Sequence, residues 1–168
     1  ILALATLVAT HSRAAEDLAI ADFEGQDYGP WITTGEALGP GPAHGTLPGQ
    51  MPVEGFEGKG LANSFYQGDG TTGTLTSPEF KIERKFIHFL IGGGRNSKTT
   101  CLNLLVAGKV VRTATGPNDK PGGSEALAPA AWDVTEFAGQ TAVLQIVDRA
   151  RGGWGHINVD HIVQTERK

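Results

Sequence analysis

Apolar residues in this chain occur in short runs, bounded on both sides by glycine, proline, asparagine or aspartate. The runs are rich in β-branched and aromatic residues, which is typical of β-strands. The predicted strands are residues 18–24, 60–66, 73–80, 85–91, 101–106, 109–114, 141–147 and 156–163. With 24 glycines and 9 prolines among 168 residues, no stretch keeps a helical period for long. The sequence therefore predicts a single all-β domain, a jelly-roll-like antiparallel β-sandwich.

Two of these runs carry signals about their place in a sheet. Residues 86–91 are apolar at nearly every position, so this strand is expected near the centre of a sheet. Ala107 and Gly108 separate two strand-like runs, and such a short connection predicts a tight hairpin.

The remaining chain offers little regular structure. Residues 133–139 can form one short helix, in which Asp133 is the N-cap and Gly139 ends the helix. Residues 35–58 and 115–131 are rich in glycine and proline and are expected to be long loops. Loops of that length in a compact domain are usually functional or disordered.

The first residues differ in composition from the rest. Residues 1–10 are apolar, and Ser12 and Ala14 are small residues in the positions that precede a signal-peptidase cut. We expect a truncated secretory signal peptide at residues 1–14 and the mature domain at residues 15–168, with an ordinary first strand as the alternative. The apolar run is shorter than the roughly 20 residues of a membrane span. A secreted protein, extracellular or periplasmic, is therefore predicted.

Charge and cysteine content exclude some classes of function. The formal net charge is −4, and the 14 lysines and arginines are scattered rather than clustered, so nucleic acid is an unexpected partner. Cys101 is the one cysteine, so no disulfide can form within the chain, and its apolar neighbours predict a buried strand position.

The densest cluster of aromatic and polar residues is found at residues 151–162. Glycines on both sides of Trp154 allow sharp backbone turns that can bring the indole to the surface, where it can stack on a sugar ring. Arg151, His156 and Asn158 lie close by and can hydrogen-bond to hydroxyl groups. The alternative, in which Trp154 fills the core at a strand entry, fits the flanking glycines equally well.

Carboxylates occur in both the first and the last predicted strand. Alternation of side chains in the last strand places Asn158, Asp160 and Ile162 on one face, opposite Ile157, Val159 and His161. The same alternation puts Asp22 and Glu24 together. If the two strands pair, three carboxylates can surround one hard cation, and oxygen ligands favour Ca²⁺. The alternative is that the carboxylates of the two strands lie on separate, solvated strand faces.

Two further loops carry candidate binding residues. Residues 115–125 combine turn formers with Asp119 and Glu125. Residues 92–96 follow the most apolar strand, so Arg95 is expected to emerge at the end of a sheet. This glycine-rich stretch lacks the spacing and the Gly-Lys-Ser/Thr ending of a phosphate-binding loop.

Motifs of the common hydrolase classes are absent. The chain has neither a Gly-x-Ser-x-Gly elbow nor a His-Glu-x-x-His helix. Its single cysteine lacks the electropositive setting of a nucleophile. The carboxylates are too numerous for the sequence to nominate a catalytic pair. We therefore expect no catalytic residues in this chain.

Several ordered motifs resemble the accessory domain of family 32 glycoside hydrolases, and are similar to family 66 carbohydrate-binding modules. They are Asp22-Phe23-Glu24-Gly25, Tyr28-Gly29-Pro30-Trp31, Gly49-Gln50-Met51, Gly58-Lys59-Gly60-Leu61, Asn63-Ser64-Phe65 and the stretches at 73–80, 89–94, 115–118 and 152–162. The resemblance covers residues 18–165. The catalytic motifs of family 32, which are Asn-Asp-Pro-Asn, Arg-Asp-Pro and Glu-Cys, do not occur here.

The resemblance implies a module that binds the terminal fructose of levan or inulin and targets a propeller-shaped levanase, inulinase or invertase to its polymer. A structural domain that only packs on the propeller, in the N-terminal part of a secreted β-fructosidase, is the alternative. In related modules, acidic residues of the first and last strands hold a structural Ca²⁺, and Asp22, Glu24 and Asp160 stand in those places.

The candidate sugar-binding residues form one set. They are Trp154, Arg151, His156, Asn158, Arg95, Asp119, Glu125 and Asp148. The indole of Trp154 would supply an apolar face, and the others are candidates for hydrogen bonds to hydroxyl groups, of which two or three are expected to make contact.

Overall fold

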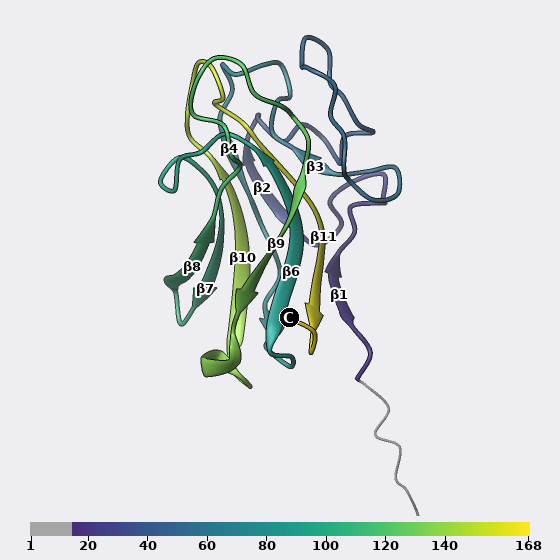
Figure 1. The fold of residues 1–168 in the computed structure, drawn as a ribbon, viewed down its shortest axis with the longest axis vertical. Helices are drawn as coiled ribbons and strands as arrows, with labels where there is room; N and C mark the ends of the chain where they lie inside the picture. Colours follow the sequence, from purple (N-terminus) through teal and green to yellow (C-terminus); the bar gives the residue numbers. More distant parts are fainter. Residues whose placement is uncertain (1–14) are drawn as a thin grey trace, which may run out of the picture.

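The computed structural model describes residues 15–168 and shows two antiparallel β-sheets packed face to face (Figure 1). The first sheet has five strands in the order β1-β11-β6-β9, and β3 pairs with the first part of β11. Its strands are β1 (Leu18–Ala21), β3 (Ala62–Asn63), β6 (Phe86–Gly93), β9 (Ala128–Asp133) and β11 (Ile157–Thr165).

The second sheet has six strands in the order β2-β4-β10-β7-β8, and β5 also pairs with β10. Its strands are β2 (Ile32–Gly35), β4 (Gly73–Thr76), β5 (Phe80–Lys81), β7 (Thr100–Val106), β8 (Lys109–Ala114) and β10 (Thr141–Asp148). One 3₁₀ turn, η1 (Thr135–Phe137), precedes β10. The predicted all-β sandwich is confirmed.

The core lies between the two sheets and consists of the inward side chains of their central strands. It contains Ile87, Phe89 and Ile91 of β6, Leu102, Leu104 and Val106 of β7, Ala142, Leu144 and Ile146 of β10, and Ile157, Val159 and Ile162 of β11. Phe89 packs on Trp132 of β9 with ring centroids 4.6 Å apart. The apolar run at 86–91 is central, as predicted, because β6 lies between β11 and β9.

A smaller apolar cluster fixes the long loop at 35–58. It joins Ala43, Val53, Leu61 and Leu127, with Leu47, Phe56 and Leu90 packed against it. Ala43 and Leu61 exchange backbone hydrogen bonds, and the Leu127 amide donates to the Glu54 carbonyl. The loop therefore keeps one position although it forms no strand of its own.

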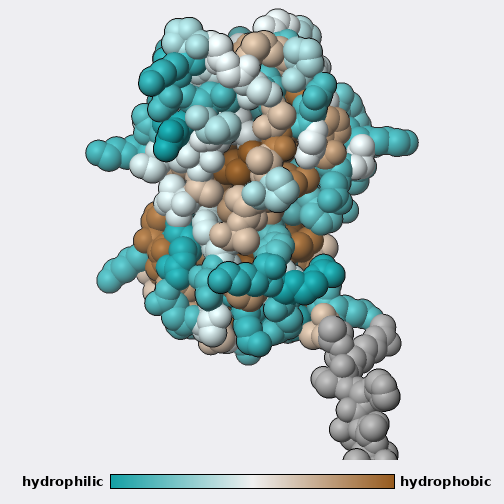
Figure 2. All heavy atoms as spheres, viewed as in Figure 1, coloured by the Kyte–Doolittle hydropathy of each residue, from teal (hydrophilic) through white to brown (hydrophobic). Residues whose placement is uncertain are grey.

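The outer face of the first sheet is partly apolar. His88 and Leu90 of β6 alternate with the core residues and are half-buried on this side. Figure 2 shows hydrophobic residues gathered in the middle of the face seen in Figure 1, with hydrophilic residues around them.

A bulge in β11 changes which side chains share a face. The pairing with β6 shifts between Asp160 and Val163, and His161 has a φ of 46°. The extra residue returns Ile162 to the core side, together with Val159. The prediction that Ile162 shares a face with Asp160, and His161 with Val159, is therefore wrong.

Two strands were not predicted, and both lie at sheet edges. β9 has the sequence Ala-Pro-Ala-Ala-Trp-Asp, in which Pro129 is tolerated because the strand pairs only with β6. Because β9 begins at Ala128, the predicted loop at 115–131 is shorter than expected. β2 is four residues long and exposed throughout, so it carries no alternating pattern.

Other boundaries differ for local reasons. The strand predicted at 18–24 ends at Ala21, because Phe23 adopts a φ of 52° and packs its ring on Tyr28 and Trp31. The strand predicted at 73–80 is interrupted around Pro78, which has no amide to donate to the sheet.

The predicted hairpin is confirmed. Ala107 and Gly108 connect β7 to β8 with φ values of 50° and 72°, as a two-residue turn of type I′ requires. The helix predicted at 133–139 is reduced to η1, followed by Gly139 with a φ of 78°.

The predicted signal peptide, residues 1–14, lies outside the described residues. Within residues 15–168, no helix has the length and apolar character needed to cross a membrane.

The Phe89 ring is a test of the sandwich core. Phe89→Ala removes a buried ring that contacts Trp132, and core truncations of this kind cost about 3–5 kcal/mol. We expect a loss of that size in the free energy of unfolding measured by urea denaturation. Val110→Ala, on an exposed side chain of β8, is the control and should change stability by less than about 0.5 kcal/mol. Equal effects of the two changes would contradict the assigned core.

Candidate functional site

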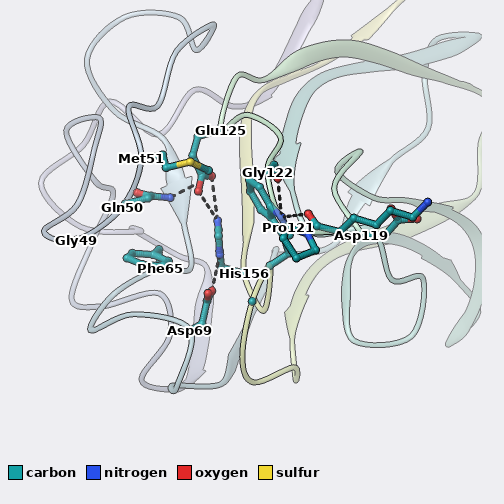
Figure 3. Close-up of a pocket in the computed structure, with 13 residues that line it drawn as sticks. Gly49, Gln50, Met51, Phe65, Asp69, Asp119, Pro121, Gly122, Glu125 and His156 are labelled. Atoms are coloured by element: carbon teal, nitrogen blue, oxygen red, sulfur yellow. Dashed lines mark hydrogen bonds and ion pairs between the residues drawn. The ribbon is translucent and has the colours of Figure 1, made fainter.

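A pocket lined by apolar and polar side chains lies at one end of the sandwich, close to the start of β11. It has a volume of about 410 Å³. Its lining comes from the loops that connect the strands: Gly49, Gln50, Met51, Phe65, Asp69, Asp119, Lys120, Pro121, Gly122, Glu125, Gly153, Trp154 and His156. In Figure 3, Gln50, Met51, Phe65, Asp69 and Glu125 lie around His156 on one side, and Asp119, Pro121 and Gly122 lie on the other. Apolar walls with a few convergent polar groups are typical of ligand sites.

His156 stands at the centre of this pocket, between two carboxylates (Figure 3). Its Nδ1 lies 2.6 Å from Asp69 Oδ1, and its Nε2 lies 3.0 and 2.9 Å from the two oxygens of Glu125. Burial alone would lower the pKa of His156, but the hydrogen bonds and charges of Glu125 and Asp69 outweigh burial and raise the pKa above its ordinary value. Both ring nitrogens face carboxylate oxygens, an arrangement in which a protonated imidazole donates to both.

Glu125 is almost fully buried, and neutral side chains complete its hydrogen bonding. The amides of Asn158 and Gln50 donate to Oε2 at 2.9 and 3.4 Å. Gln50 is itself held by Asn63, whose Nδ2 donates to Gln50 Oε1 at 2.8 Å. A buried carboxylate needs such partners to stay ionised. The network ties the loop at 35–58 to the start of β11.

Trp154 forms one wall of the pocket. It has a φ of 60°, which is rare for a bulky residue, and Gly152, Gly153 and Gly155 surround it. Its Nε1 donates to the carbonyls of Lys120 at 2.8 Å and Gly122 at 3.2 Å. The ring is half-buried and lies outside the sandwich core. Of the two positions predicted for Trp154, the surface position is the one observed.

The loop that meets Trp154 is closed by Asn118. Asn118 Nδ2 donates to the carbonyls of Gly93 at 3.0 Å and Ser124 at 2.8 Å. A Cβ atom on Gly123, whose φ is 105°, would lie 2.3 Å from Asn118 Oδ1 and 3.1 Å from the indole. Only glycine fits at this position, and the absence of a side chain allows the loop to pack against the indole of Trp154.

Phe65 and Met51 complete the apolar lining. The ring of Phe65 meets His156 edge-on, with centroids 4.9 Å apart and planes at 78°. Trp154 flanks the same imidazole at 5.6 Å. Met51 is 43% exposed, which is unusual for a large apolar side chain and places it at the pocket mouth.

The structure brings together part of the predicted binding set. Trp154, His156, Asp119 and Glu125 line the pocket. Asn158 is buried behind Glu125 and supports it. These residues come from two separate stretches of the sequence, 115–125 and 151–162, and their convergence depends on the topology of the sandwich.

The other predicted residues lie apart from the lining. Arg95 is exposed and lies 3.7 Å from an oxygen of Asp119, at the rim. Arg151 is exposed and does not line the pocket. Asp148 is fully buried at the end of β10. A sugar-binding role for each residue of the set stays a prediction.

Asp148 is a buried carboxyl group with few partners. Neither of its oxygens has a hydrogen bond of standard geometry. Burial raises the pKa of Asp148 to about 7, although the Ser64 hydroxyl and the Ala150 amide lower it in part. The positive charge of His156 lowers this pKa and the negative charge of Asp69 raises it, so Asp148 belongs to the same electrostatic cluster.

Sequence reasoning missed several lining residues. Asp69 lies in a Gly-Asp-Gly turn between β3 and β4, and nothing local distinguishes it from an ordinary turn aspartate. Gln50, Met51 and Phe65 belong to motifs that carry the family resemblance, and that resemblance was the available signal for them.

The predicted cation ligands lie at a different place, beside the segment at 57–60. Glu24 Oε1 accepts hydrogen bonds from the amides of Lys59 and Gly60 at 2.8 and 2.9 Å, which lower its pKa. Asp160 Oδ2 accepts from the Glu57 amide at 2.8 Å. Asp22 instead accepts a hydrogen bond from the Glu24 amide.

Asp160 carries the feature that best fits a cation. Its Oδ1 is buried without a hydrogen-bond partner. Burial raises the pKa of Asp160 to about 6, and the negative charge of Glu24 adds to this rise. Within residues 15–168, no group of three or more histidine, cysteine, aspartate or glutamate side chains is arranged to hold a metal. Calcium binding at Asp22, Glu24 and Asp160 stays a prediction.

Comparisons with known proteins give one related sequence. No protein-family model matches the chain. Over 144 residues the chain is 47% identical to ecdE of Aspergillus rugulosus, which is provisionally named a glycosyl hydrolase. The alignment covers 84% of this chain and 20% of ecdE. The chain thus spans about one fifth of that relative.

Solved structures support the fold. The K2 cleaved adhesin domain of Lys-gingipain is similar with a TM-score of 0.57 and 17% identity, covering 89% of this chain and 97% of that domain. The K1 adhesin domain of the Porphyromonas gingivalis protein gives a TM-score of 0.55 and 16% identity, covering 92% and 100%. An apo cyclase from Fischerella sp. gives 0.53 and 14%, covering 89% and 96%. At these identities the likeness shows the β-sandwich alone.

Asp148 predicts a pH dependence of stability. Its pKa is higher in the folded state than the ordinary 3.8, so the folded protein holds a proton that the unfolded chain has lost, and stability falls as pH rises from about 4 to about 7. Asp148→Asn removes this loss. We expect the variant to match the parent within about 1 kcal/mol at pH 4 and to exceed its free energy of unfolding by roughly 3–4 kcal/mol at pH 8.

Urea denaturation at the two pH values measures this difference. Glu79→Gln removes the same charge at an exposed site and should leave the pH profile of the parent unchanged. An Asp148→Asn profile parallel to that of the parent would show that Asp148 is ionised throughout this range.

Proposed function

We propose that this chain is a non-catalytic carbohydrate-binding module of a larger glycoside hydrolase. The observation that carries the proposal is the pocket in which Trp154 and Phe65 flank a polar floor of His156, Glu125 and Asp69. Sugars have apolar C–H faces and rings of hydroxyl groups, so aromatic walls and carboxylate acceptors match both sides of their chemistry. The relation to one fifth of ecdE supports a part of a larger hydrolase.

Catalysis is assigned to other parts of the parent protein. His156, Asp69 and Glu125 bind one another, so the imidazole has no free nitrogen for proton transfer. Cys101 is buried, and burial raises the pKa of its thiol, which makes it unsuitable as a nucleophile. We place the parent protein outside the cell, where polysaccharides are found.

The proposed ligand is the terminal fructose of a fructan such as levan or inulin, and the parent would then be a family 32 levanase or related β-fructosidase. Support comes from the motifs shared with that family, several of which build the pocket: Gly49-Gln50-Met51, Asn63-Ser64-Phe65 and residues 152–162. A pocket closed at its floor by a buried network suits the end of a polymer rather than its middle.

A structural role is the second candidate. The outer face of the first sheet holds a hollow of about 230 Å³ lined partly by Leu90, Pro129 and Val163, and hydrophobic residues gather on this face (Figure 2). Such a face suits packing against a catalytic domain of the same parent. This role is compatible with sugar binding, because the pocket lies at the end of the sandwich.

Titration calorimetry with levan and inulin oligosaccharides tests the proposal. Trp154→Ala should weaken binding about tenfold or more, because an aromatic contact contributes roughly 1 kcal/mol and the adjoining loop loses its anchor. Trp154→Phe keeps an aromatic face without the indole donor and should lose less. Val110→Ala serves as the control outside the pocket. Absence of binding by the parent at millimolar fructose ends would refute the fructan assignment.

We also propose a structural Ca²⁺ at Glu24 and Asp160. The support is the unpartnered Asp160 Oδ1, which lies close enough to Glu24 for the charge of Glu24 to raise the pKa of Asp160. A cation bound only to the folded state raises its stability. Millimolar Ca²⁺ should raise the melting temperature of chelator-treated protein by several degrees, and Asp160→Asn should abolish the rise. An equal rise in Asp22→Asn would show that Asp22 is dispensable.

A further inference from the structure

Apart from the exposed Lys120, the side-chain donors that line the pocket are already occupied within the protein. His156 donates from both ring nitrogens to Asp69 and Glu125. Trp154 Nε1 donates to two backbone carbonyls. The Gln50 amide donates to Asn63 and Glu125. A ligand that needs to accept hydrogen bonds from these side chains would first have to break bonds that hold the pocket together.

The acceptors of the pocket are only partly used. Within residues 15–168, Asp69 Oδ2 receives no hydrogen bond, and Asp69 is partly exposed. Glu125 Oε1 receives only the His156 bond at 3.0 Å. Asp119 has one ion-pair neighbour, Arg95, at 3.7 Å. An ionised carboxylate can accept up to about four hydrogen bonds, so this lining offers acceptors to a bound molecule.

The net charge of the floor is negative, which also disfavours an anionic ligand. A protonated His156 between Asp69 and Glu125 leaves one net negative charge, in a setting that is largely closed to solvent. Lys120 is the lining residue that opposes it, and its side chain is exposed, where water screens its charge. A ligand carboxylate at the floor would therefore meet like charge without a buried cation to offset it.

We propose that the pocket recognises neutral sugars through the hydroxyl protons they donate, and that it discriminates against acidic sugars such as uronates. This inference rests on the proposed carbohydrate-binding function and specifies the chemical class of its ligand. The floor of Asp69 and Glu125 sets the preference, while the aromatic walls bind neutral and acidic rings alike.

The test compares two probes that differ in one group. Inulin oligosaccharides are used as prepared and after oxidation of their primary hydroxyls to carboxylates, in calorimetry at pH 7 and low salt. The oxidised probe should bind at least tenfold more weakly. Because screening reduces repulsion between charges, the difference should narrow at high salt. Equal or tighter binding of the oxidised probe would overturn the inference and leave the proposed function standing.

A variant assigns the effect to the floor. Asp69→Asn keeps an oxygen facing His156 but replaces one free acceptor by an amide that donates. It should weaken binding of the neutral probe a few-fold and reduce the discrimination between the probes. Glu79→Gln, with the same change of charge outside the pocket, should leave the discrimination intact; if it reduced the discrimination equally, net charge and not the floor would be responsible. Failure of both probes to bind the parent would instead refute the proposed fructan-binding function.

Discussion

The ion-paired imidazole of His156 is the interaction on which the arrangement of the pocket depends. Asp69 and Glu125 are 87 and 31 residues away in sequence, and both meet this ring. One side chain therefore joins the β3–β4 loop, the β8–β9 loop and the start of β11. His156 and Glu125 are buried and Asp69 is partly exposed, and burying ionisable groups is unfavourable unless they pair closely and their other hydrogen bonds are satisfied. Gln50 and Asn158 supply those bonds for Glu125, which extends the same network into the loop at 35–58.

The fold was predictable wherever local pattern and burial agree. The runs that became β6, β7, β10 and β11 are apolar because they line the core, and the positive φ values of Ala107 and Gly108 match a two-residue connection. β2 and β9 were not predicted, because edge strands need neither an alternating apolar and polar pattern nor β-branched residues. The bulge at His161 was not predicted either. A single inserted residue moves every later side chain of the strand to the opposite face of the sheet, and the amino-acid composition does not reveal it.

The site was less predictable than the fold, for a physical reason. Trp154 could be identified from the sequence because its flanking glycines indicate an unusual backbone conformation. The observed φ of 60° is strained for a bulky residue, and the flexible glycines on either side allow it. Asp69 and Gln50 could not be found by such reasoning, because their roles come from partners that the topology brings near. Asp148 shows the converse: it was a candidate for contact with sugar, yet the fold buries it below the floor.

The same contacts connect specificity with stability. A floor that uses all its side-chain donors internally is rigid before any ligand arrives, so little ordering remains to be done on binding. In the same part of the fold, burial leaves the charge of Asp148 poorly compensated and raises its pKa to about 7. The negative charge of Asp69, which gives the floor an acceptor, is among the causes that raise the pKa of Asp148. The carboxylate of Asp69 thus both offers an acceptor in the pocket and adds to the rise in the Asp148 pKa, and that rise lowers the stability of the folded state in alkaline solution.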